Sequence, residues 1–208
     1  MEIGFIQKGL YYLIALVISF SIHEFAHAYS AVKAGDNTPK MYGRLTLNPA
    51  AHLDPIGAIF LVIMAFMHVG IAWGKPVPVN PNNFKSPKKD DIIVSLSGIF
   101  MNFCIAFLAG LVLRLLGESI PKSAFLFFYI LVNVNVWLAI FNLIPIPPLD
   151  GSHVLMHLLP YNTAKAYANF VARYSMFIFL GFIFLLRTQF GLIIILPIQI
   201  LVKLFSGV

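Results

Sequence analysis

Six apolar stretches make up most of this chain and constrain its fold more than any other feature of the sequence. A helix needs about 20 residues to cross the hydrocarbon core of a bilayer, and most of these stretches reach that length. Hydrophobic residues amount to 60% and charged residues to 11% of the 208 residues, which is too little polar surface for a soluble domain. The sequence therefore predicts an all-α polytopic membrane protein and excludes a soluble enzyme or a disordered chain. The stretches are 9–32, 56–73, 92–116, 124–146, 170–186 and 190–206.

About five to six helical segments are expected to be embedded in the membrane, within a single domain of residues 1–208. The net charge is +6, but the basic residues lie mainly in short loops between the apolar stretches. This placement predicts a lipid bilayer, and no nucleic acid, as the partner. The loops 35–55 and 74–91 contain turn residues and prolines, so we expect short extended or β-like segments there. The single cysteine, Cys104, excludes a disulfide framework and a cysteine-ligated zinc site.

The first apolar stretch contains the sequence His23-Glu24-Phe25-Ala26-His27. Residues four apart lie on one face of a helix, so both imidazoles can bind one metal ion while Glu24 faces a water molecule bound to it. A zinc ion lowers the pKa of such a water toward neutrality, and a carboxylate can then accept its proton. Ionisable residues are costly to bury in an apolar helix, which indicates a functional site. The alternative is a polar helix interface that neighbouring helices satisfy.

A catalytic zinc ion with two histidine ligands needs a third protein ligand and an open position. Glu118 lies in a short loop, so an aspartate is the better candidate. Asp150 ends a proline-broken stretch that closes an apolar segment, and a carboxylate there is expected to have a cation partner. Asp54, which is expected to cap a helix, is the next candidate. The others are Asp36, in a turn, and Asp90 and Asp91, expected to be a solvated pair at a helix start.

Two motifs together resemble the site-2 protease family of intramembrane zinc metalloproteases. They are H-E-x-x-H at residues 23–27 and N-x-x-P-x-P-x-L-D-G at residues 142–151, and both are complete. The stretches 48–57 (NPAAHLDPIG) and 75–80 (KPVPVN) resemble a small subgroup of that family without PDZ or CBS domains. One difference is that the family's Gly-Pro-x-x-Asn signature reads Gly98-Ile99-Phe100-Met101-Asn102 here. The missing proline affects the geometry of the helix start, not the metal chemistry.

The resemblance implies a zinc metalloendopeptidase with one Zn²⁺ per chain, bound by His23, His27 and Asp150, and with Glu24 as the general base. The expected reaction is hydrolysis of peptide bonds in the transmembrane helices of protein substrates. The alternative is a non-proteolytic membrane protein, either a metal transporter or a degenerate relative that only binds helices. A transporter is expected to spread ionisable residues over several helices, whereas the interior carboxylates here reduce to Glu24 and Asp150.

Substrate contacts are expected from residues outside the zinc ligands. An extended proline-containing stretch and the loop 35–55 can pair with an unwound substrate as an added strand. For His52 the alternative is a role in stabilising a turn, and His153 and His157 either bind a second metal or lie in an interfacial helix. The residues expected to contact substrate are Asn102, Asn142, His52, Pro76, Val77, Pro78 and Val79.

The positions of the proposed ligands also predict the topology. His27 lies near the end of the first stretch and Asp150 follows the fourth, so these two stretches must run in the same direction to bring the ligands together. One intervening stretch must then fail to cross, and 56–73 is the candidate, as a re-entrant hairpin or partly inserted helix. In that case 10 of the 14 Lys and Arg residues lie on one side. This predicts the active site toward the cytoplasmic side, the N-terminus outside and the C-terminus inside.

Overall fold

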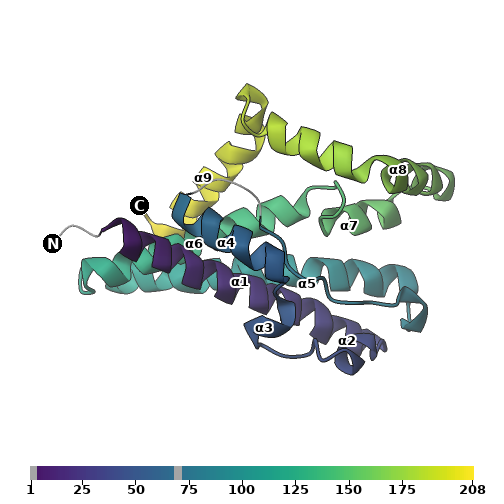
Figure 1. Cartoon of the computed structure of the whole chain (residues 1–208), viewed down its shortest axis with the longest axis horizontal. Helices are drawn as coiled ribbons and strands as arrows, with labels where there is room; N and C mark the ends of the chain where they lie inside the picture. Colours follow the sequence, from purple (N-terminus) through teal and green to yellow (C-terminus); the bar gives the residue numbers. More distant parts are fainter. Residues whose placement is uncertain (1–3, 68–71) are drawn as a thin grey trace.

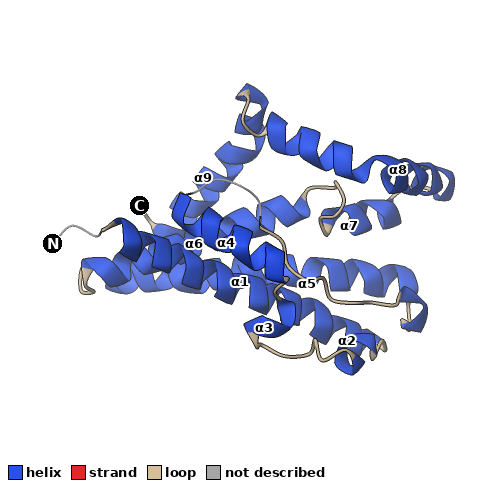
Figure 2. Cartoon of the chain, viewed as in Figure 1, coloured by secondary structure: helices blue, strands red, loops and turns tan. Residues whose placement is uncertain are grey.

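The computed structural model describes residues 4–67 and 72–208, and helices account for most of them (Figures 1 and 2). The described residues form no β-sheet, and their one isolated bridge joins Leu53 to Gly74. The prediction of an all-α protein is therefore confirmed. The elements are α1 Phe5–Ala34, α2 Thr38–Met41, α3 Pro49–His52, α4 Pro55–Met67, η1 Pro81–Asn83, α5 Pro87–Leu116, α6 Lys122–Leu143, α7 Gly151–Leu158, α8 Tyr161–Leu185, η2 Gln189–Gly191 and α9 Leu192–Ser206.

Five helical segments within the described residues are long and apolar enough to cross a membrane: α1, α5, α6, α8 and residues 189–206. This confirms the predicted number of embedded segments and makes the protein a multi-pass membrane protein. Helix α8 begins at Tyr161, nine residues before the expected stretch 170–186, because its first turns carry polar residues that form helix without being apolar. Helix α6 ends at Leu143 rather than 146, where Pro145 prevents the helix from continuing.

Helices α1, α5 and α6 pack side by side and form the centre of the molecule (Figure 1). Small side chains line their contacts, among them Ala15 on α1 and Ala106 and Ala109 on α5. Small residues let helix backbones approach closely, which drives helix association where lipid removes the hydrophobic effect. The bundle therefore has a tightly packed centre into which polar side chains can be fixed.

Helix α4 does not cross the membrane by itself. Its 13 residues extend about 20 Å, well short of the hydrocarbon core. The chain before and after it is held together by the Leu53–Gly74 bridge and by a hydrogen bond of 2.8 Å from the Lys75 N–H to the His52 carbonyl. Both ends of the predicted stretch 56–73 thus lie at one level of the bundle, as expected, although residues 68–71 lie outside the described residues.

The C-terminus lies at the end of the bundle where α1 begins, because α8 and α9 follow each other toward that end and traverse the bundle once between them (Figure 1). This differs from the prediction, which places the two ends of the chain on opposite sides. Ile198 and Val202 of α9 pack between α5 and α6. The Nε of Arg114, near the end of α5, donates a hydrogen bond of 3.1 Å to the Phe205 carbonyl. These contacts fix the direction of α9, which the apolar pattern alone did not predict. Lys203 is then no longer among the 10 Lys and Arg residues predicted on one side of the membrane.

Candidate zinc site

Three side chains, two from α1 and one from the turn before α7, converge on one point. His23 and His27 lie one turn apart on α1, and Asp150 is the residue before α7. The Nε2 atoms of the two histidines are 2.9 Å apart. Oδ2 of Asp150 lies 3.2 Å from Nε2 of His23 and 3.3 Å from Nε2 of His27. Ligands of a tetrahedral zinc ion with bonds of about 2.0 Å are roughly 3.3 Å from one another. The three atoms are thus spaced as three corners of such a site.

Hydrogen bonds fix which nitrogen of each imidazole carries the proton. Nδ1 of His23 lies 2.7 Å from Oδ1 of Asn102, and Nδ1 of His27 lies 2.7 Å from the Val94 carbonyl. Both partners are acceptors, so each Nδ1 is the donor and each Nε2 presents a lone pair. Because an amide oxygen and nitrogen look alike, the assignment depends on the network behind Asn102.

That network runs through buried polar groups of α1, α5 and α6. Nδ2 of Asn135 donates to the Leu131 carbonyl at 2.8 Å and to Oγ of Ser19 at 2.7 Å, which leaves Oδ1 of Asn135 to accept from Nδ2 of Asn102 at 2.9 Å. Asn102 therefore has to present its oxygen to His23. Ser19, Asn102 and Asn135 are all fully buried. The sequence analysis missed Ser19 and Asn135, although polar residues inside apolar helices are the signal that indicates them.

The surroundings of the Asp150 carboxylate are compatible with a metal ion. Its Oδ2 is buried and has no hydrogen-bond donor among the described residues, although it faces both Nε2 atoms. The two Nε2 atoms and this oxygen all present lone pairs, and no hydrogen lies between them. Such atoms repel one another unless a cation lies at their centre. Within the described residues, these three side chains are also the only group of three or more whose ligand atoms lie within 4.8 Å of one another.

Gly98 of α5 keeps the space beside His23 and His27 open. A Cβ atom at this position would lie 2.5 Å from Nε2 of His27 and 2.6 Å from Nδ1 of His23. Any side chain would therefore displace the imidazoles. The glycine of the family signature is retained here for a steric reason that the structure makes explicit.

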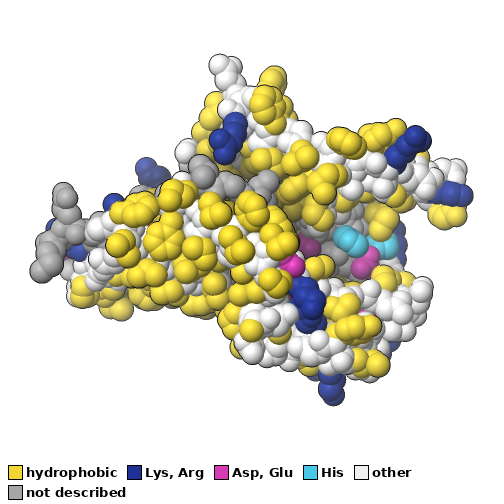
Figure 3. Space-filling model, in the orientation of Figure 1, with side chains coloured by type: hydrophobic (Ala, Val, Ile, Leu, Met, Phe, Trp, Pro, Cys, Tyr) yellow, Lys and Arg dark blue, Asp and Glu magenta, His cyan; other side chains and the backbone are white. Residues whose placement is uncertain are grey.

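Glu24 is buried on α1, next to His23 in the sequence. In the space-filling view, acidic and histidine side chains are visible inside a hollow between the part of the molecule that contains α7 and α8 and the part that contains α1 (Figure 3). Hydrophobic side chains gather along the upper edge of this hollow, whereas its lower edge also carries basic and other side chains.

Of the other predicted site residues, three make hydrogen bonds within the fold and four lie in a loop. Asn102 is fully buried and holds His23, and Asn142 donates from Nδ2 to the Leu138 carbonyl at 3.0 Å. His52 is fully buried with Nε2 2.8 Å from the Thr46 carbonyl, which matches its turn-stabilising alternative. Pro76, Val77, Pro78 and Val79 form an extended stretch without regular secondary structure.

Two buried charged residues of the loop 35–55 hold the ends of this extended stretch. The carboxylate of Asp36 accepts hydrogen bonds from the Asn80 N–H at 2.7 Å and from Nδ2 of Asn83 at 2.8 Å. Burial by itself raises the pKa of Asp36, but these hydrogen bonds and those from Thr38 lower it below its ordinary value. At the other end, the guanidinium of Arg44 donates to the Lys75 carbonyl at 3.1 Å. The sequence analysis placed Asp36 in a turn and did not predict this role.

Asp91 is not solvated, so the prediction for the Asp90–Asp91 pair is wrong for this residue. Its side chain is buried, with Oδ2 2.6 Å from Nε2 of His157 and 3.7 Å from Nδ1 of His153. The interaction with Asp91 raises the pKa of His153. Asp90 does lie at the helix start, where its Oδ2 accepts from the Ser86 N–H at 2.7 Å. The capping role predicted for Asp54 is confirmed, because its Oδ1 accepts from Gly57 N–H at 2.8 Å.

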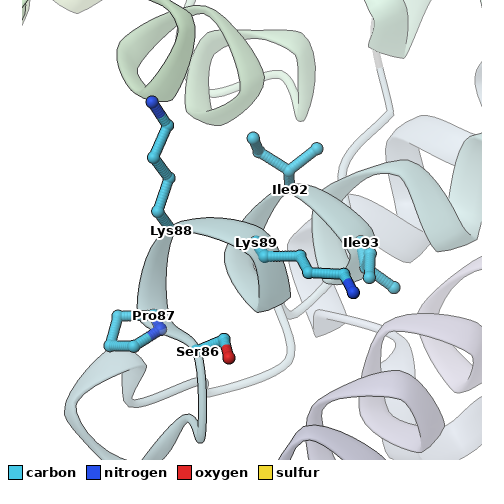
Figure 4. Close-up of a pocket in the computed structure, with 6 residues that line it drawn as sticks. All are labelled: Ser86, Pro87, Lys88, Lys89, Ile92 and Ile93. Carbon is cyan, nitrogen blue, oxygen red and sulfur yellow. The ribbon is translucent and has the colours of Figure 1, made fainter.

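A separate surface pocket of about 550 Å³ lies at the start of α5 (Figure 4). Lys88 and Lys89 are exposed at this pocket, beside the apolar side chains of Ile92 and Ile93. None of the predicted site residues lines it, so it is not part of the candidate zinc site. Its lining residues are Ser86, Pro87, Lys88, Lys89, Ile92 and Ile93.

The sequence has clear relatives. Residues 108–186, which include Asp150, match Peptidase family M50. The protein named "Putative zinc metalloprotease YwhC" of Bacillus subtilis is 36% identical over 210 residues, which cover 95% of this chain and 92% of that protein. The chain belongs to peptidase family M50. The resemblance stated from the two motifs is thereby confirmed. No solved structure matches.

Other relatives are longer than this chain. The protein named "Putative zinc metalloprotease Rip2" of Mycobacterium tuberculosis is 30% identical over 176 residues, covering 84% of this chain and 66% of that protein. Rip2 of Mycolicibacterium smegmatis is 30% identical over 153 residues, covering 73% of this chain and 58% of that protein. Membership in the family makes this protein a membrane metalloprotease with Zn²⁺ as its cofactor and a protein as its substrate.

Proposed function

We propose that the protein is an intramembrane protease that binds zinc through His23, His27 and Asp150 and hydrolyses transmembrane segments of its substrates. The observation that carries this proposal is the convergence of two Nε2 lone pairs and an unpaired buried carboxylate oxygen at tetrahedral spacing. The site lies between helices long enough to span a membrane. We also infer that residues 1–208 act as one domain, because the ligands come from both halves of the chain.

Glu24 is the general base of the proposed reaction. Bound zinc polarises the scissile carbonyl and lowers the pKa of a water molecule. The carboxylate of Glu24 accepts the proton of that water and later delivers it to the leaving amine. Its burial beside the ligands, on the same helix turn, supports this role because a general base must lie within hydrogen-bond reach of the proton it takes.

The extended stretch 75–80 is the proposed binding site for the unwound substrate. Arg44 and Asp36 hold its two ends, while the backbone of residues 76–79 forms no hydrogen bond to any other described residue. Its free N–H and carbonyl groups can therefore pair with a substrate in extended conformation, as in other cases of strand addition. A substrate helix has to unwind for attack, since its own hydrogen bonds hide its carbonyls.

The charge distribution supports an active site toward the cytoplasm. Positively charged loops stay on the cytoplasmic side of a membrane. Five lysines lie in the loops and helix ends at the end of the bundle where α1 finishes and α5 begins, which is also the end nearer the ligands. They are Lys33, Lys40, Lys85, Lys88 and Lys89.

Cleavage of a single-span test substrate by the purified protein, reconstituted in liposomes, tests the proposal together with the variant Glu24→Gln. This variant keeps the shape of the side chain and all three proposed ligands. We expect it to retain zinc while the cleavage rate falls by about two orders of magnitude or more. Near-normal cleavage would remove Glu24 from the mechanism, and loss of zinc would show that Glu24 supports the ligands instead.

A further inference from the structure

One face of α5 contacts every element that contributes a zinc ligand. Asp91, Val94, Gly98 and Asn102 follow one another at intervals of three and four residues, which places them in a row along the helix. Asn102 and the Val94 carbonyl hold the Nδ1 atoms of His23 and His27, and Gly98 leaves room for both rings. Three members of the row, Val94, Gly98 and Asn102, thus face the histidines of α1. Asp91 contacts α7 instead.

Asp91 holds the far end of the short helix that begins after the third ligand. Oδ2 of Asp91 lies 2.6 Å from Nε2 of His157, which is seven residues, or two helical turns, beyond Asp150. His153 lies one turn closer, but its 3.7 Å separation from Asp91 is too long for a hydrogen bond. The carboxylate of Asp91 is buried, so the charge-assisted bond to His157 is shielded from water.

The near end of α7 is fixed by packing against α6. A Cβ atom at Gly151 would lie 2.2 Å from the Leu143 carbonyl, and Leu149 is buried. Oγ of Ser152 also donates to the Leu149 carbonyl at 2.6 Å. Helix α7 is therefore held by close packing next to Asp150 and by the bond to Asp91 at its other end. Because both ends of the helix are held, Asp150, the residue that precedes it, keeps its position.

We propose that Asp91 is a positioning residue for the zinc site, which holds Asp150 in place against His23 and His27 through its bond to His157. The proposal rests on the proposed role of Asp150 as a zinc ligand. It makes α5 the common support of all three ligands: two through direct hydrogen bonds to the imidazoles and the third through α7. Partners behind metal ligands commonly change metal affinity by 10–100-fold when they are removed.

The test measures zinc affinity of the purified, metal-depleted protein by competition with a chromophoric chelator, a readout that does not depend on proteolysis. We expect Asp91→Ala to bind zinc about tenfold more weakly than wild type. Asp90→Asn, a change of the neighbouring carboxylate, is the matched control and should bind as wild type. His157→Ala should weaken binding to the same degree, whereas His157→Gln keeps a donor near the position of Nε2 and should restore most of the affinity.

A double-mutant cycle separates positioning from general support of the fold. If Asp91 acts through Asp150, adding Asp91→Ala to an Asp150→Asn background should change zinc affinity by less than twofold, about the error of additivity. An equal loss in both backgrounds, or wild-type affinity in Asp91→Ala, would overturn the inference while leaving the proposed function intact. Wild-type affinity in Asp150→Asn would overturn both. If Asp91→Ala does not fold, the two His157 variants and the same cycle decide the question.

Discussion

At the scale of single residues, the hydrogen bonds of His23 and His27 decide what their rings can bind. Both Nδ1 atoms donate to fixed acceptors, so neither Nε2 can donate to the other across 2.9 Å. The motif predicted that the two imidazoles share a helix face. It could not predict the acceptors, because Asn102 and the Val94 carbonyl come from a helix about 70 residues or more away along the chain.

Gly98→Ala tests the steric part of this arrangement. The new methyl group would lie within 2.6 Å of both imidazoles, which their hydrogen bonds prevent from moving away. We expect zinc affinity to fall about tenfold or more and cleavage to fall with it. The measurement is the chelator competition described above.

Gly181→Ala is the control for this prediction, since nothing lies within 4 Å of a Cβ atom at that position of α8. It should bind zinc as wild type. Normal zinc affinity in Gly98→Ala would contradict the geometry of the site.

At the scale of elements, the apolar pattern predicted the long helices, whereas the connections between them depend on contacts that a pattern does not contain. The extended stretch 75–80 follows from its prolines. Its position depends on hydrogen bonds with the buried residues Asp36 and Arg44. Their burial could not be predicted, because they lie in a loop rich in turn residues. Asp91 shows the same limit, because its partner on α7 is 66 residues away.

Val77→Pro tests the extended stretch as a binding site for substrate. Proline suits an extended backbone between Pro76 and Pro78 but removes the N–H that a paired substrate strand would use. We expect cleavage of the single-span substrate to fall by about tenfold, the effect of about one hydrogen bond, while zinc content stays unchanged. Substrate cleavage and zinc content are measured on the same preparation.

Val77→Ala keeps the N–H and serves as the control, with cleavage near the wild-type rate. Equal rates for Val77→Pro and wild type would argue against pairing at this residue.

At the scale of the whole molecule, the requirement that ligands meet at one depth predicted that residues 56–73 do not cross, and the Leu53–Gly74 bridge agrees with it by joining the chain on the two sides of α4. It gave no information on the last two helices. There, Val208 lines the same pocket as Glu118 and Ser119 of the α5–α6 loop, which places the C-terminus at that end of the bundle. The charge count could not reveal this, because moving Lys203 changes the division by a single residue.

Single cysteines in a Cys104→Ala background test this topology in cells. Cysteines at Lys40 and Lys85, on the two sides of α4, should react with an impermeant thiol reagent only from the cytoplasmic side. Cysteines at Lys122 and Val208 should react only from the outside. The physical reason is that α4 returns to the level it started from, while α9 ends beside α5.

Two labelling results would contradict this arrangement. Opposite labelling at Lys40 and Lys85 would mean that the α4 region crosses the membrane. Cytoplasmic labelling at Val208 would mean that α9 runs in the other direction.

The central claim is that His23, His27 and Asp150 hold one zinc ion, and the most direct test is the zinc-to-protein ratio of protein purified without chelator. We predict about one zinc per chain in wild type and a large loss in Asp150→Ala, because two remaining ligands cannot hold a tetrahedral site. Asp54→Ala, at the other candidate aspartate, removes only a helix cap and should keep its zinc. Wild-type protein free of metal, or loss of zinc in Asp54→Ala but not in Asp150→Ala, would contradict the account.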